Sequence, residues 1–262
     1  MVGTINGRNH ARPIYNFFHS TADNIGDRMC GPAQYFWPNI CKNLPIGSNL
    51  GDPIEAAIIG GGQIFSQIPE VIAKVLMGNP SAKILAWGIG LPPRGKRDRL
   101  VEQMSESLVA LGTRNFDWKD RFPFVPCASC MSPIFDQAGP PEHEVVVYLH
   151  RKKPGPLDIP SGIPTMTNSM RPSEYAINFI ASGKTVVTSS YHGVYWAQLL
   201  GRRVVCIPFN NKFETFQFSP KMADPKGWLH AIPDAKCTEP LLEEYRALNT
   251  AFAQHAMEVL NV

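Results

Sequence analysis

The stretch Ala56–Gln63, which reads AAIIGGGQ, places four apolar residues directly before three glycines. A short apolar run bounded by turn residues is typical of a buried strand, and the next fourteen residues have a helical pattern. Glycines at such a junction let a backbone approach a ligand closely, and a helix N-terminus favours an anion or a hydroxyl there. A tight strand-to-helix turn explains the same glycines equally well. The stretch therefore predicts a strand–turn–helix unit, with Gly61, Gly62 and Gln63 as candidate binding residues.

The same alternation of short apolar runs and helical patterns recurs along the chain. The expected strands are Ile14–Phe18, Ala56–Ile59, Lys83–Trp87, Val145–Leu149, Thr185–Thr188 and Arg203–Pro208. The expected helices are Arg28–Phe36, Ile64–Met77, Asp98–Leu111, Arg171–Ser182, Tyr191–Leu200 and Leu241–Leu260. Strands that alternate with helices indicate βαβ units, so the fold class is α/β with parallel sheets.

A proline-rich segment interrupts this alternation. Pro123–Pro141 holds five prolines in nineteen residues, and the α/β pattern restarts after it. The segment is typical of a linker or hinge. We therefore expect two Rossmann-like domains, one formed by residues 1–138 and the other by residues 139–262.

Composition and charge narrow the functional classes. The chain has 262 residues, of which 44% are hydrophobic and 18% charged, and its formal net charge is +3. This balance excludes wholesale disorder, and the small charge without a basic cluster argues against nucleic-acid binding. No apolar run approaches the roughly 20 residues of a membrane helix. Because Met1–Pro13 is polar where a leader would be apolar, we expect a cytoplasmic protein.

The six cysteines are expected to be reduced thiols in that compartment. Cys127 and Cys130 form a C-x-x-C motif, which could be half of a zinc site or a redox pair. A structural zinc site needs about four ligands, and the sequence has no second C-x-x-C and no H-x-x-x-H. The interpretation favoured by the sequence is two buried thiols, and no metal ligand set is predicted.

The loops after the strands are the places to search, because ligands of parallel sheets bind beyond the carboxyl ends of the strands. Asn24, Gly26 and Asp27 follow the first expected strand. Capping of the next helix is one role for Asp27. The other is to hold or deprotonate a sugar hydroxyl.

The segment Ser189–Gly193, which reads SSYHG, follows a strand and begins a helix. His192 falls in the first turn of that helix, where the helix dipole favours a neutral imidazole suited to acid–base work. A packed or capping histidine is the simpler alternative. No G-x-S-x-G elbow is present, so a Ser-His-Asp hydrolase is not indicated.

Two cations follow strands of the second half. Arg151 comes directly after Val145–Leu149, and Lys212 follows Arg203–Pro208. Arginine can grip a phosphate or a carboxylate with two parallel hydrogen bonds. Solvated basic turns explain both residues nearly as well.

In their order and spacing these segments resemble the polysaccharide pyruvyl transferase family. The resemblance rests on N-x-G-D (Asn24, Gly26, Asp27), G-G-G (Gly60–Gly62), G-x-G (Gly88, Gly90), S-x-x-H-G (Ser189, His192, Gly193) and a lysine after a later strand (Lys212). It implies two Rossmann-like domains facing each other across a cleft, in a GT-B-like arrangement. The C-terminal helix is expected to pack back on the N-terminal domain.

The resemblance also implies an activity and a set of roles. Family members transfer the pyruvyl group of phosphoenolpyruvate to hydroxyls of a sugar in a surface polysaccharide or its lipid-linked precursor. Such a protein meets lipid-linked acceptors at the inner face of the membrane and needs no cofactor besides its donor substrate. His192 and Asp27 would be catalytic. Donor binding would fall to Arg151, Ser189, Ser190, Gly193 and Lys212, and acceptor binding to Asn24, Gly26, Gly61, Gly62 and Gln63.

One departure from the family pattern keeps two alternatives open. The family has Arg-Leu before the histidine, and this chain has Ser190-Tyr191, so Arg151, Lys212 or Arg202 would have to supply the missing cation. A glycosyltransferase with a nucleotide-sugar donor is the first alternative, with Glu214 as its ribose-binding carboxylate. A non-catalytic glycan-binding relative is the second.

Overall fold

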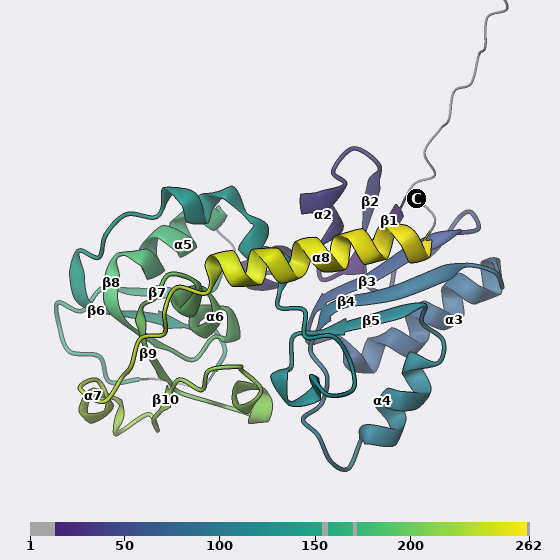
Figure 1. Ribbon diagram of the computed structural model, residues 1–262. Coiled ribbons are helices and arrows are strands. Elements are labelled where there is room, and N and C mark those ends of the chain that lie inside the picture. Colours follow the sequence, from purple (N-terminus) through teal and green to yellow (C-terminus); the bar gives the residue numbers. More distant parts are fainter. Residues whose placement is uncertain (1–13, 154–156, 170–171, 261–262) are drawn as a thin grey trace, which may run out of the picture.

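The computed structural model describes residues 14–153, 157–169 and 172–260, so the polar segment Met1–Pro13 lies outside the described residues. The first half forms a five-stranded parallel sheet of order β2-β1-β3-β4-β5 (Figure 1). Its strands are β1 (Ile14–Phe18), β2 (Cys41–Pro45), β3 (Ala56–Gly62), β4 (Lys83–Ile89) and β5 (Ala110–Thr113). The second half forms another, of order β10-β9-β8-β6-β7. Its strands are β6 (His143–Leu149), β7 (Thr165–Thr167), β8 (Gly183–Thr188), β9 (Arg203–Cys206) and β10 (Lys221–Met222).

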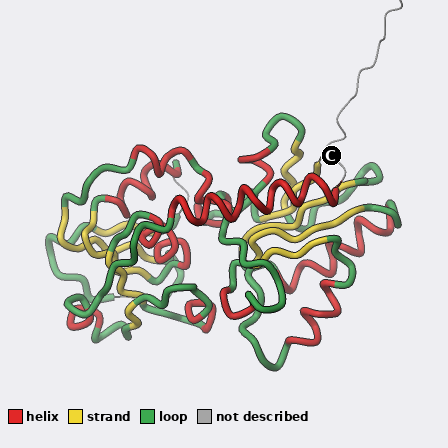
Figure 2. Tube along the Cα trace, viewed as in Figure 1, coloured by secondary structure: helices red, strands yellow, loops and turns green. Residues whose placement is uncertain are grey.

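Helices connect the strands and cover the sheets. They are α1 (Ile25–Arg28), α2 (Ala33–Phe36), α3 (Ile68–Gly78), α4 (Asp98–Ser105), α5 (Ser173–Ala181), α6 (Tyr191–Leu199), α7 (Trp228–Ala231) and α8 (Leu242–Leu260). Short 3₁₀ turns and loops link the rest (Figure 2). The predicted class, two Rossmann-like α/β domains with parallel sheets, is thereby confirmed.

Alternating side chains of the central strands explain why each sheet is covered on both faces. In β3, Ala57 and Ile59 pack with α3 and α4, whereas Ile58 points to the opposite face. There it joins Trp87 of β4 and Phe252 of α8. Such nearly continuous apolar strands are what a parallel sheet buried on both sides requires.

The C-terminal helix α8 returns from the second domain to the first, as predicted (Figure 1). The ring of Phe252 meets Trp87 edge to face at a centroid distance of 5.0 Å. The indole Nε1 of Trp87 donates to Asn249 Oδ1 at 2.9 Å. Helix α8 therefore completes the core of the N-terminal sheet.

The proline-rich segment is also tied to α8. It forms two 3₁₀ turns, Ala128–Met131 and Pro133–Gln137. Arg246 of α8 donates to the carbonyls of Cys130 and Ser132 and pairs with Asp136. The expected linker is thus a packed segment along this helix.

Two predicted helices end differently in the structure. The helix expected over Asp98–Leu111 stops at Ser105, and its apolar end forms the separate strand β5. The helix expected over Arg28–Phe36 is split into α1 and α2 by Gly31-Pro32. Proline has no N–H to donate and disfavours a helical residue before it.

The glycines Gly60–Gly62 belong to β3 and not to the turn predicted after it. A side chain on Gly60 would overlap the backbone of Trp87 in the neighbouring strand. The N–H of Gly61 donates to the carbonyl of Cys30 at 3.0 Å. Close packing of β3 against β4 and the end of α1 accounts for these two glycines.

Candidate active site between the two sheets

Two motifs that are far apart in the sequence touch where the carboxyl ends of the two sheets meet. A side chain on Gly26, in α1, would overlap the ring of His192, in α6. The Ile25 N–H also donates to the carbonyl of Asn168 in the second domain at 3.2 Å. Glycine at position 26 therefore lets the N-x-G-D segment approach the S-x-x-H-G segment closely.

His192 is buried, with 3% of its surface exposed. Its Nε2 lies 3.3 Å from Cys30 Sγ and 3.5 Å from Cys127 Sγ, and the two sulfurs are 3.5 Å apart. These three side chains could hold a metal ion. Of the two thiols of the C-x-x-C motif, Cys127 is the one that contacts Cys30. The sulfur of Cys130 instead lies 3.4 Å from Asn249 Nδ2.

The surroundings distinguish the two thiols. Burial raises the pKa of Cys127, but hydrogen bonds with Cys30 and His192 outweigh it and hold the pKa well below the ordinary value. The positive charge of Arg114 acts in the same direction. Cys127 is therefore the thiol of this pair that ionises more readily.

Arg114 is a site residue that the sequence did not reveal. It follows β5 and is 4% exposed, and its guanidinium lies 3.8 Å from the ring centroid of Tyr191. Its Nε and Nη1 have no hydrogen-bond partner among the described residues. Burial lowers its pKa, but the neighbouring Tyr191 and the two thiols raise it overall, so the group stays charged.

Arg114 contacts Tyr191 at the start of α6. Tyr191 is next to Ser190, and Arg114 reaches this place from the opposite domain. Arg202, one of the cations expected to compensate, precedes β9 at the other end of the sheet and donates to the Gly139 carbonyl at 3.0 Å.

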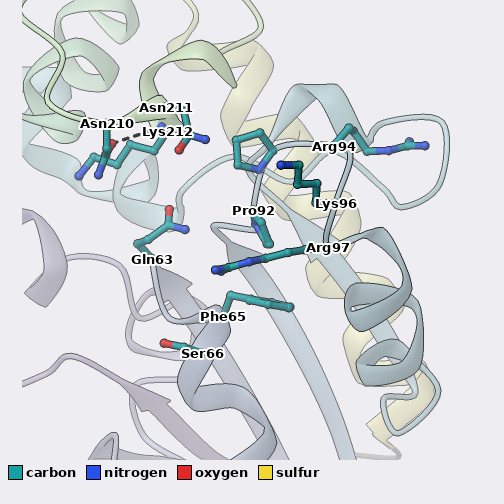
Figure 3. A pocket seen from close by; sticks show the side chains of 11 residues that line it. Gln63, Phe65, Ser66, Pro92, Arg94, Lys96, Arg97, Asn210, Asn211 and Lys212 are labelled. Atoms are coloured by element: carbon teal, nitrogen blue, oxygen red, sulfur yellow. Dashed lines mark hydrogen bonds between the residues drawn. The ribbon is translucent and has the colours of Figure 1, made fainter.

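A cavity of about 510 Å³ opens between the two domains. Its described lining includes the four cations Arg94, Lys96, Arg97 and Lys212, and none of its lining residues carries a carboxylate. We call it the cationic cavity. In Figure 3, Lys212 and Arg97 lie on opposite walls, whereas Arg94 points away, toward its ion pair with Asp98.

Lys212 and Gln63 are the predicted site residues that line the cationic cavity. The Lys212 ammonium lies over the Phe209 ring, 4.5 Å from its centroid. Burial, with the charge of Arg114, lowers the pKa of Lys212 to about 8. Lys212 therefore titrates in the physiological range.

A second, smaller cavity of about 160 Å³ contains the other polar candidates. Asn24, Asp27 and Arg151 line it. Arg151 forms an ion pair with Asp23, and Asn24 Nδ2 donates to Asp27 at 2.9 Å. The structure thus separates Arg151 from Lys212 by placing them on different cavities.

The remaining candidates are engaged within the protein. Ser189 Oγ accepts from the His150 N–H and donates to the Lys153 carbonyl. Ser190 is buried at the start of α6, and a side chain on Gly193 would overlap Thr188. Glu214 is exposed in the 3₁₀ turn after Asn210, and Gly61 and Gly62 are buried in β3.

Comparisons with known proteins bear on the fold. No family model matches the sequence, and no curated protein matches it. A crystal structure of an uncharacterized protein from Klebsiella pneumoniae is similar, with a TM-score of 0.50 and 17% identity over 82% of this chain and 93% of that chain. A Listeria monocytogenes protein assigned as a UDP-N-acetylglucosamine 2-epimerase gives a TM-score of 0.44 and 10% identity over 91% and 89%. The first likeness shows the fold alone.

Within the described part of the chain, no helix has the length and apolar character needed to cross a membrane.

Proposed function

We propose that the protein is a transferase that binds a small, multiply charged anionic donor in the cationic cavity and passes a group to a sugar hydroxyl. One observation supports the proposal most strongly. The described residues that line a cavity at the carboxyl ends of two facing sheets include the cations Lys96, Arg97 and Lys212 besides the paired Arg94, and none of them carries a carboxylate. Anions of small substrates are bound at such strand ends in α/β folds. The donor that best fits the sequence motifs is phosphoenolpyruvate, and the group transferred is its pyruvyl group.

The donor would be held from both domains. Lys212 and Arg97 face each other across the cavity and suit the phosphate (Figure 3). Arg114 suits the carboxylate, because two of its buried nitrogens have no hydrogen-bond partner among the described residues, and such a group gains most from a bidentate anion. Arg114 then takes the place of the cation missing at Ser190.

The acceptor would lie toward the smaller cavity. The Asp27 carboxylate lines it and is partly exposed, so it can orient a sugar hydroxyl and accept its proton. Asn24 holds that carboxylate through its amide.

The reaction needs one proton donor. Protonation of the methylene carbon makes the neighbouring carbon electrophilic, a sugar hydroxyl attacks it, and the bond to phosphate breaks. A second hydroxyl closes the ketal, and the two hydroxyl protons balance those gained by the methyl group and by phosphate. The sequence assigns the proton donor to His192. That assignment stays a prediction. The ring of His192 contacts two thiols, and Lys212 is a titratable cation that lines the cavity itself.

Incubation with phosphoenolpyruvate and a panel of β-galactoside and N-acetylmannosamine acceptors tests the proposal. Phosphate release matched by an acceptor that gains a carboxyethylidene group is the expected result. Phosphate release or donor binding without such a product contradicts it. Thermal shifts with nucleotide sugars separate the glycosyltransferase alternative, because the true donor stabilises the fold. Stabilisation by a glycan and by no donor would identify a glycan-binding protein.

A further inference from the structure

Three segments bring two thiols and one imidazole together in the interior. Cys30 follows α1, Cys127 lies in the proline-rich segment and His192 belongs to α6. All three side chains are buried. Their possible ligand atoms lie within 4.8 Å of one another. The cluster therefore joins both domains and the segment between them.

The spacing of the cluster matches a tetrahedral zinc centre. With Zn–S near 2.3 Å and Zn–N near 2.0 Å, two thiolates on one ion stand about 3.8 Å apart, and a thiolate and an imidazole nitrogen about 3.5 Å. The two sulfurs here are 3.5 Å apart, and Nε2 lies 3.3 and 3.5 Å from them. Shifts of a few tenths of an ångström would complete the geometry.

The surroundings also suit a metal. One Zn²⁺ with two thiolates has no net charge, which lowers the cost of burying it. The Ser129 hydroxyl lies 3.3 Å from Cys127 Sγ and donates to it, and the Trp196 Nε1–H holds the same hydroxyl at 3.0 Å. In known metal sites, hydrogen bonds to a coordinating side chain orient that side chain toward the metal. The bare backbone of Gly26 against the His192 ring directs Nε2 toward the sulfurs.

We propose that Cys30, Cys127 and His192 bind one Zn²⁺ ion between the two domains. Binding replaces two S–H bonds by two Zn–S bonds and releases two protons to the buffer. No fourth side chain of the described residues joins the cluster, so water or another external ligand completes the shell. Sites with three protein ligands and one open position are common for zinc. The ion would fasten α1 to α6.

One consequence depends on the proposed function. A zinc ion takes the lone pair of His192 Nε2, and the same nitrogen then cannot carry a proton during transfer. Metal binding itself is independent of that reaction and is measured without substrates.

Titration of the reduced, metal-free protein with Co²⁺ tests the site. We expect one equivalent bound per chain, with visible bands of a tetrahedral ion, a near-ultraviolet thiolate band, and displacement by Zn²⁺. Cys30→Ser, Cys127→Ser and His192→Asn should each weaken binding at least roughly tenfold, the smaller loss known for outer-shell changes. The controls Cys130→Ser, from the same C-x-x-C motif, and Cys41→Ser, from β2, should bind as the unchanged protein does.

A second measurement needs no variant and therefore does not depend on their folding. X-ray absorption of the zinc-loaded protein should show two sulfur ligands and at least one nitrogen. A shell without sulfur, absence of cobalt binding, or equal weakening by the control substitutions would overturn the proposal. Loss of two hydrogen atoms by mass with no metal bound, assigned to Cys30 and Cys127 by peptide mapping, would show a disulfide between them instead.

Discussion

The cationic cavity and the Cys30–Cys127–His192 cluster lie at the same meeting of strand ends, yet they offer opposite environments. The cavity is open, and its charges come from lysine and arginine. The cluster is buried and consists of two thiols and an imidazole. Arg114 acts electrostatically on both, since its charge influences Lys212 on one side and Cys127 on the other. The comparison indicates that Arg114 couples the two regions, whereas Lys212 and the buried cluster can be altered separately.

Replacement of His192 is expected to have the largest effect. In the metal-free protein, His192→Ala should lower the rate of pyruvyl transfer by a factor of roughly 100 or more, the usual scale for an acid–base group. The KM for phosphoenolpyruvate should change little, because the role predicted for the ring is proton transfer and not anion binding. Steady-state phosphate release measures both constants, with the exposed His255→Ala on α8 as control. Unchanged turnover would assign His192 to the metal or the packing alone.

Replacement of Arg114 examines the connection between the two regions. Arg114→Leu should weaken phosphoenolpyruvate binding roughly 10- to 100-fold, since a hydrogen bond to a charged group contributes about 1.5–3 kcal/mol. The free energy of unfolding should not fall, because the substitution removes a buried charge with two nitrogens that lack a partner in the described part of the chain. Calorimetric titration and thermal unfolding measure the two quantities. Arg121→Leu, which breaks an exposed pair with Glu102, is the matched control. A less stable protein with full donor affinity would make Arg114 a packing residue.

A side chain introduced at Gly26 tests how tightly α1 packs against His192 of the buried cluster. Gly26→Ala should lower the free energy of unfolding by about 1–3 kcal/mol, the usual cost of overpacking, because the new Cβ overlaps the His192 ring. Urea unfolding measures the change. Gly51→Ala, where a Cβ meets nothing within 4 Å, provides the comparison. Equal stability of the two variants would mean that the domains move apart easily at α1.

The pH dependence of donor binding tests the role of Lys212 in the cationic cavity. It is the smallest of the expected effects. Lys212 is charged below its pKa of about 8 and neutral above it. Donor affinity should therefore fall as the pH rises through 8, by at most about tenfold per pH unit. Binding curves between pH 7 and 9 show this, and Lys212→Arg should remove the dependence. Arg151→Ala should retain it, since Arg151 lies on the other cavity in an ion pair with Asp23.

The sequence predicts much of the framework and less of the site. Strong apolar runs such as Ile14–Phe18 identify their strands, and the turn SSYHG starts α6 where expected. Strand β5 was missed because its apolar residues continue a helical pattern. Arg114 was missed for the same reason, because its place in the site becomes apparent only once the residues before it are known to form a strand.

The Cys30–Cys127–His192 cluster could not be predicted from the spacing of its residues in the sequence. Cys30 is 97 residues from Cys127, and Cys127 is 65 residues from His192, so no local motif joins them. The C-x-x-C motif directs attention to Cys130, whereas the fold turns that thiol to Asn249. The approach of Gly26 to α6 places His192 near Cys30, and the proline-rich segment adds Cys127.

The return of α8 to the first sheet has a consequence for how the protein is made. One face of that sheet, around Ile58 and Trp87, is covered by Phe252, Ala253 and Ala256 near the end of the chain. During synthesis this face stays uncovered while the second domain is translated. The first domain can therefore complete its core only after α8 has left the ribosome, and folding of the N-terminal half is delayed until that helix has been translated.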